Sequence, residues 1–164
     1  MHLDPPADTL RQAYDSLARL ADDVDAVTLR VERDERVPRA DVERAVDRLA
    51  DAAARCFGAQ EERVVFPLVR ATGAVGERFT RELADQHAAL AAAARKARAE
   101  AAAGDGASEP ARRQLAHDAR QLTLLVRRQV EVEARRFLPL LQALPQARRL
   151  EIAETFAGGE VRAP

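Results

Sequence analysis

The sequence predicts an all-α protein, an up-down-up-down four-helix bundle followed by a short fifth helix. Apolar residues recur at steps of three and four through four long segments, which is the spacing of amphipathic helices, and no segment alternates as a strand does. Ala, Leu, Arg and Glu are abundant and only 7 residues are glycine, a composition typical of helices. Four helices of roughly 25 to 35 residues joined by short connections are antiparallel neighbours, so a bundle is the simplest architecture.

The first helix is expected to run from about Asp8 to Glu35, with Asp8 as its N-cap behind a Pro-Pro pair. The second starts at Pro38. The third follows the segment ATGAVG, residues 71–76, which contains two glycines suited to a turn.

The segment AAAGDGASEP, residues 101–110, is expected to be a loop, with Ser108 as the N-cap of the fourth helix. A fifth helix from Pro145 to Ala157 should end at Gly158 and Gly159. We therefore expect one domain over residues 1–164, with the bundle from about 8 to 144 and the short helix from about 145 to 157.

Composition excludes several classes of partner. The 26 basic and 27 acidic residues are mixed along the chain, whereas binding to nucleic acid requires a basic face. No apolar stretch approaches the ~18 residues of a membrane helix, and the first residues lack the pattern of a signal peptide. With a single cysteine, Cys56, no internal disulfide can form. We expect a cytoplasmic protein that binds neither nucleic acid nor membrane.

Five polar residues stand on the inner stripes of the predicted helices, where the apolar period calls for Leu or Val. They are Tyr14, Glu61, His87, Gln129 and Glu133. Helical bundles build metal sites from Glu and His side chains that project inward from facing helices. The set is therefore a candidate metal site.

Two of these acids begin a repeated motif. Glu61 opens a run in which Pro67 follows six residues later, and Glu133 stands six residues before Pro139. With His87 between them, the pattern resembles the hemerythrin-like family, also called HHE cation-binding domains, over about residues 10–141. The resemblance implies a hemerythrin-like bundle that holds two irons and has dioxygen, iron or nitric oxide chemistry and regulatory roles.

Three of the four family histidines are replaced. Phe57 stands four residues before Glu61, Gln129 stands four residues before Glu133, and Tyr14 takes the position on the first helix. An oxygen-carrying di-iron centre is therefore not expected. Phe57 should fill the space of a histidine and its metal, and we expect Cys56 to be a small buried hydrophobe beside this pocket.

Each polar residue also has an interpretation without a metal. The two glutamates could lie at the edge of the stripe, and His87 could be a core histidine bonded to a carboxylate. Tyr14 should then donate to Glu61 or Glu133, and Gln129 to either acid. If both carboxylates are buried, desolvation and mutual repulsion require a proton, a metal, a buried arginine such as Arg55, or water.

Two local features of the helices have structural interpretations. Mid-helix Gly58 indicates either a close helix approach or a bulge. Pro67 and Pro139 each remove one backbone hydrogen bond and should bend their helices.

Three functions remain open, and the first is favoured. It is a hemerythrin-like bundle with an eroded site and no cofactor, acting as a regulatory, structural or ligand-binding module rather than an enzyme. The second is a mononuclear iron site formed by Glu61, His87 and Glu133, with Tyr14 or Gln129 completing the shell and a redox, dioxygen or nitric oxide role. The third is a metal-free acid/base enzyme in the vacated pocket. A small-molecule ligand in the bundle and a homodimer are compatible with the pattern.

Overall fold

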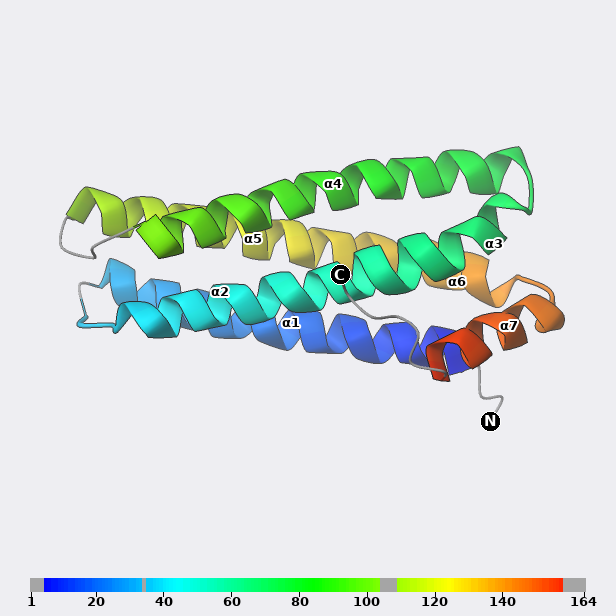
Figure 1. Cartoon of the computed structure of the whole chain (residues 1–164), viewed down its shortest axis with the longest axis horizontal. Helices are drawn as coiled ribbons and strands as arrows, with labels where there is room; N and C mark the ends of the chain where they lie inside the picture. Colours follow the sequence, from blue (N-terminus) through cyan, green and yellow to red (C-terminus); the bar gives the residue numbers. More distant parts are fainter. Residues whose placement is uncertain (1–4, 34, 104–108, 158–164) are drawn as a thin grey trace.

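The computed structural model describes residues 5–33, 35–103 and 109–157, and shows four long antiparallel helical rods with a short helix across one end (Figure 1). The first rod is α1, Pro5–Glu32. The second joins α2, Arg39–Ala53, through a π-helical segment η1, Ala54–Val65, to α3, Phe66–Arg70; the third is α4, Ala74–Ala103. The fourth joins α5, Glu109–Val132, through η2, Glu133–Phe137, to α6, Leu138–Gln142, and α7 is Gln146–Ala157. The predicted up-down-up-down bundle with a fifth helix is confirmed.

Two predicted helix ends are corrected. Helix α1 begins at Pro5 and not at Asp8, because the fixed φ of proline suits the first helical turn. Asp8 therefore lies inside that turn, where it pairs with Arg11 at 2.8 Å instead of capping the helix. Helix α1 ends at Glu32, and Glu35 belongs to the connection that leads to α2.

The predicted loop at 101–110 is shorter than expected. Helix α4 continues through Ala103 and α5 starts at Glu109, because alanine favours the helix over the turn. Ser108, Gly158 and Gly159 lie outside the described residues.

The core lies along the axis between the four rods, where α1 packs against α2 and α5, and α4 packs against the same two helices. Leu10, Leu17 and Val24 of α1 are at most 1% exposed, so the three-four spacing correctly identified the inner face. Helix α7 packs against α1 and η1 and closes one end.

Both proline-containing rods change from α- to π-helical hydrogen bonding just before the proline. The amide of Phe66 donates to the carbonyl of Glu61 instead of Glu62, and the amide of Leu138 donates to the carbonyl of Glu133. A proline ring clashes with the carbonyl four residues earlier, and the wider π turn gives that carbonyl room. The prolines thus do more than bend the rods: each follows a π segment that contains an inward glutamate.

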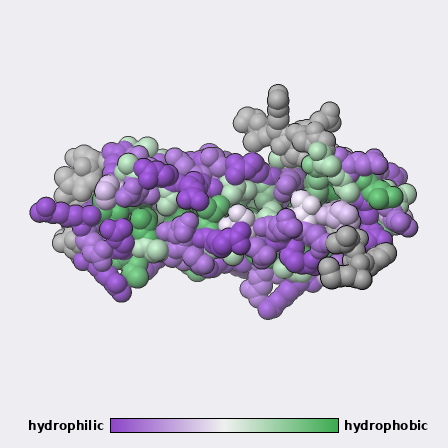
Figure 2. Space-filling model, turned by 90° about the horizontal axis from the view of Figure 1, so that it is seen from below, coloured by the Kyte–Doolittle hydropathy of each residue, from purple (hydrophilic) through white to green (hydrophobic). Residues whose placement is uncertain are grey.

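The outer faces are those of amphipathic helices. Figure 2 shows mostly hydrophilic side chains on the side that faces down in Figure 1, with hydrophobic groups in small separate patches. Within the part of the chain that the structure describes, no helix combines the length and apolarity needed to cross a membrane.

Two glycines give opposite predictions for stability. At Gly58 an added Cβ meets nothing within 4 Å, so of the two alternatives for this residue the bulge is correct and the close helix approach is wrong. At Gly76 an added Cβ runs into the backbone carbonyl oxygen of Val69. We expect Gly58→Ala to raise the free energy of unfolding by about 0.5 to 1 kcal/mol, because alanine loses less backbone entropy on folding.

Gly76→Ala should instead destabilise the protein by about 1 to 3 kcal/mol through overpacking. Urea unfolding of the two variants and the wild type tests both signs. If Gly58→Ala destabilises the protein, η1 requires a glycine for a reason other than space.

Candidate metal centre

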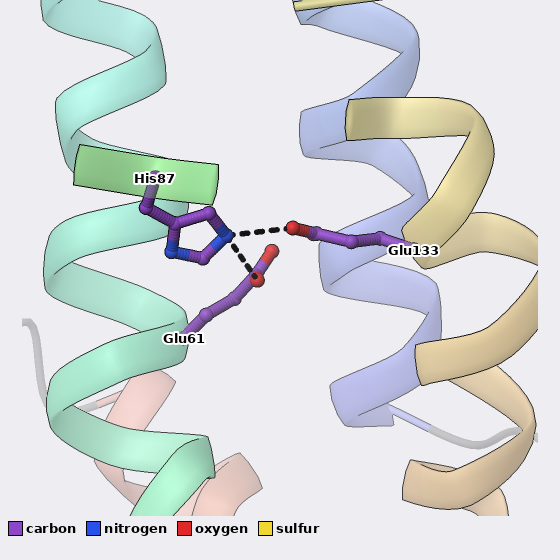
Figure 3. A group of neighbouring side chains, drawn as sticks. All are labelled: Glu61, His87 and Glu133. Carbon is purple, nitrogen blue, oxygen red and sulfur yellow. Dashed lines mark hydrogen bonds and ion pairs between the residues drawn. The ribbon is translucent and has the colours of Figure 1, made fainter. Parts of the chain in front are cut away.

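Glu61, His87 and Glu133 converge in the middle of the bundle from three different rods. Glu61 lies in η1, His87 in α4 and Glu133 at the start of η2, and one donor atom from each lies within 4.8 Å of the other two (Figure 3). Both glutamates are 0% exposed and His87 is 5% exposed. The alternative in which the glutamates lie at the edge of the stripe is therefore wrong.

Each carboxylate keeps one oxygen free of hydrogen bonds. The Tyr14 hydroxyl donates to Glu61 Oε1 at 2.9 Å, and Gln129 donates its amide to Glu133 Oε1, so both predicted contacts are confirmed. Glu61 Oε2 and Glu133 Oε2 are buried and have no hydrogen-bond partner among the described residues. Buried polar atoms without a hydrogen-bond partner are rare in folded proteins, so these two oxygens are candidates for contact with a proton, a water molecule or a cation.

His87 has a carboxylate at both ring nitrogens. Nδ1 lies 2.8 Å from Glu62 Oε1, and Nε2 lies 2.7 Å from Glu133 Oε1 and 3.7 Å from Glu61 Oε2. A neutral imidazole carries one N–H donor, and an ionised carboxylate can only accept. A proton must therefore lie in the contact between Nε2 and Glu133 when no cation is bound, while Nδ1–H donates to Glu62.

Burial dominates the electrostatics of the cluster. It raises the pKa of Glu61 well above its ordinary 4.5, and the negative charge of Glu133 raises it further. Burial and the neighbouring charge of Glu61 also raise the pKa of the Tyr14 hydroxyl and of the Cys56 thiol. Both groups are therefore neutral hydrogen-bond donors at neutral pH.

Two contacts of the site escaped the sequence analysis. The Cys56 thiol donates to Glu61 Oε1 at 3.6 Å, so Cys56 is more than a small hydrophobe. Glu62, half-buried, orients the imidazole of His87. Cys56 and Glu61 are five residues apart, which is the span of a π-helical hydrogen bond, and a period of 3.6 residues assigns the wrong phase to this segment. Gly58 and Pro67 were the available signals of an irregular helix.

Phe57 is buried and stacks on His87 with ring centroids 4.9 Å apart, so it lies beside the three donors. The alternative of a buried arginine is wrong. Arg55 is exposed and does not neutralise the carboxylates.

An aromatic layer closes the cluster on one side. Phe66 stacks on His87 with ring centroids 5.6 Å apart, and Phe137 packs edge-on against Phe66 at 5.5 Å. Phe66, His87 and Phe137 are all buried, so this layer keeps water from the cluster and lowers the local dielectric constant.

The donor set suits a metal cation. Carboxylate and imidazole ligands bind iron, manganese and zinc, and a metal-binding histidine usually donates its other N–H to a carboxylate, as His87 does to Glu62. The buried unpaired oxygens of Glu61 and Glu133 are available as ligand atoms. The side chains present therefore fit one metal ion.

Fold and site together define a four-helix bundle with a buried cluster of two carboxylates and one imidazole. A model of the hemerythrin family, described as the hemerythrin HHE cation binding domain, matches residues 6–141. The chain belongs to this family. No curated protein and no solved structure has significant similarity to it.

Tyr14→Phe tests the hydrogen bond to Glu61. The substitution keeps the ring but removes the donor, so the buried Oε1 atom retains only the weak thiol contact. We expect the free energy of unfolding of metal-free protein to fall by about 1 to 2 kcal/mol in urea unfolding near neutral pH. An unchanged value would show that Tyr14 contributes packing alone.

Glu61 should also make stability depend on pH. Because its pKa is higher in the folded protein, the folded state holds a proton that the unfolded chain has lost, so stability falls as pH rises above about 4.5. The slope is at most about 1.4 kcal/mol per pH unit and ends at the folded pKa. Glu61→Gln should flatten the curve when both metal-free proteins are unfolded in urea from about pH 5 to about pH 8. Parallel curves would contradict this assignment.

Proposed function

We propose that the protein binds a single metal ion, iron by family relationship, through Glu61, His87 and Glu133. One observation carries this proposal. Glu61, His87 and Glu133 each offer one donor atom within 4.8 Å of the other two, a separation that suits one cation, and each glutamate has a buried oxygen without a hydrogen-bond partner among the described residues. Three protein ligands leave coordination positions for a small molecule, which is the arrangement of functional rather than purely structural sites.

Charge balance supports one ion. Two ionised carboxylates neutralise a divalent cation, which removes the mutual repulsion and much of the desolvation penalty of the pair. The second carboxylate partner of His87, Glu62, lies on the outer side of the ring and is half-buried. The Glu62 carboxylate therefore orients the His87 imidazole without adding a negative charge between Glu61 and Glu133.

Each neighbouring side chain has a distinct part in this proposal. Glu62 accepts from Nδ1 of His87 and so directs the lone pair of Nε2 inward. Tyr14 and Gln129 hold the two carboxylates in place by donating to their Oε1 atoms, and the aromatic layer excludes water. When bound, ferrous iron would supply one-electron chemistry and open coordination positions.

A metal-free bundle is the second candidate, and one contact favours it. The 2.7 Å contact between His87 Nε2 and Glu133 Oε1 has the length of a hydrogen bond, so a shared proton can close the cluster without a cation. In this case the family's site survives as a buried polar network that acts in a structural or regulatory module. Metal analysis separates the two candidates.

Protein purified after growth with added iron should contain about one metal ion per chain, measured by plasma mass spectrometry. Glu61→Gln and Glu133→Gln should abolish uptake, because each removes a ligand charge. Glu62→Gln should weaken the affinity by roughly tenfold, because the imidazole loses its carboxylate partner. Because burial raises the pKa of Glu61, binding should also release protons in a weakly buffered titration, and the release should be smaller for Glu61→Gln.

Glu131→Gln is the matched control for Glu133→Gln. Glu131 is exposed on the rod that carries Glu133, and among the described residues it pairs only with Arg135. The control variant should bind metal as the wild type does. Metal-free wild-type protein that takes up no iron, manganese or zinc would establish the metal-free candidate. Uptake that survives both ligand substitutions would place the site elsewhere.

A further inference from the structure

A groove runs along the outside of the bundle between the second rod and α4. Its volume is about 440 Å³. Small side chains form both walls: Ala50, Ala53 and Ala54 on the second rod, and Ala88, Ala91 and Ala94 on α4. Methyl groups do not fill the space between helices whose separation is set by the larger residues of the core, so an apolar channel remains.

The groove reaches the outer side of the candidate metal centre. The stacked rings of Phe57 and His87 form part of the groove wall. Gly58 also lines the groove and leaves open space there, since an added Cβ meets nothing within 4 Å. The metal ligands lie on the opposite side of the His87 ring, where Nε2 faces the carboxylates. Occupation of the groove therefore needs no metal.

Charge differs between the two ends. Arg95 and Arg98 line one end. Arg98 is held at 2.8 Å by Asp47 and also bonds Asp51, whereas Arg95 is exposed and has no ion pair among the described residues. Glu62 and Arg63 line the other end, where their opposite charges offset each other, so an anionic group is favoured at the Arg95 end. A ligand with one anionic end would therefore bind in one orientation.

We propose that this groove binds a linear amphiphilic monocarboxylate. The carboxylate pairs with Arg95, and the unbranched chain lies along the alanines as far as Phe57. Arg95 and His87 are eight residues apart on α4, which is about 12 Å at ~1.5 Å per residue and matches a medium-length saturated chain. A branched or bulky body would not fit between two helices, and a cationic head would meet the arginines.

Decanoate is a suitable probe, measured by isothermal titration calorimetry on the full chain without metal. We expect one site per chain. Arg95→Ala should weaken binding by about tenfold, because a charge-assisted contact is lost. Ala91→Leu should weaken it by a similar factor, because the larger side chain occupies the groove. Decylammonium, with the same chain and the opposite charge, should not bind.

Two matched controls keep the test specific. Ala92→Leu places the same side chain on α4 outside the groove, and Arg128→Ala removes an exposed arginine from α5. Both should bind decanoate as the wild type does, and thermal melts should show that all variants are folded. Absence of binding to the wild type, equal binding of decylammonium, or equal affinity in all variants would overturn the proposal.

Discussion

Two carboxylates face each other across the bundle at 0% exposure, and most other features of the centre follow from the need to stabilise them. Ionised carboxylates accept hydrogen bonds and cannot donate, so a buried pair requires donors from every neighbouring rod. The protein supplies a phenol from α1, a thiol from η1, an imidazole from α4 and an amide from α5. These donors satisfy one oxygen of each glutamate and leave the other oxygen of each for a proton or a cation.

The backbone is adapted to the same constraint. In both proline-containing rods the carbonyl of the inward glutamate accepts the π-type hydrogen bond that precedes the proline. A π turn is less stable than an α turn and persists where a side chain must be re-aimed, which explains its frequent place at functional sites. The prolines therefore help to fix the direction of Glu61 and Glu133, although neither contributes a polar atom to the cluster.

The sequence predicted the regular parts of the molecule well, because the hydrophobic period is an average over many residues. The bundle and the inner faces followed from it, and it left an inward position of Glu61 and Glu133 as one of two alternatives. It missed contacts where the helix departs from 3.6 residues per turn: Glu62 was assigned no part in the site, and Cys56 was expected beside the pocket as a hydrophobe and not as a hydrogen-bond donor to Glu61. Those contacts depend on the local π geometry, which residue spacing alone does not reveal.

The substitutions relative to the family pattern argue for one ion and against two. Tyr14 and Gln129 stand where the family has histidines, and each now donates a hydrogen bond to a glutamate. They therefore use the carboxylate oxygens that would otherwise face a second cation. Two carboxylates balance the charge of one divalent ion, whereas a second ion would leave uncompensated positive charge in an apolar interior. Two of the three replaced histidine positions therefore carry hydrogen-bond donors, and the charge of the two remaining carboxylates would balance a single divalent cation.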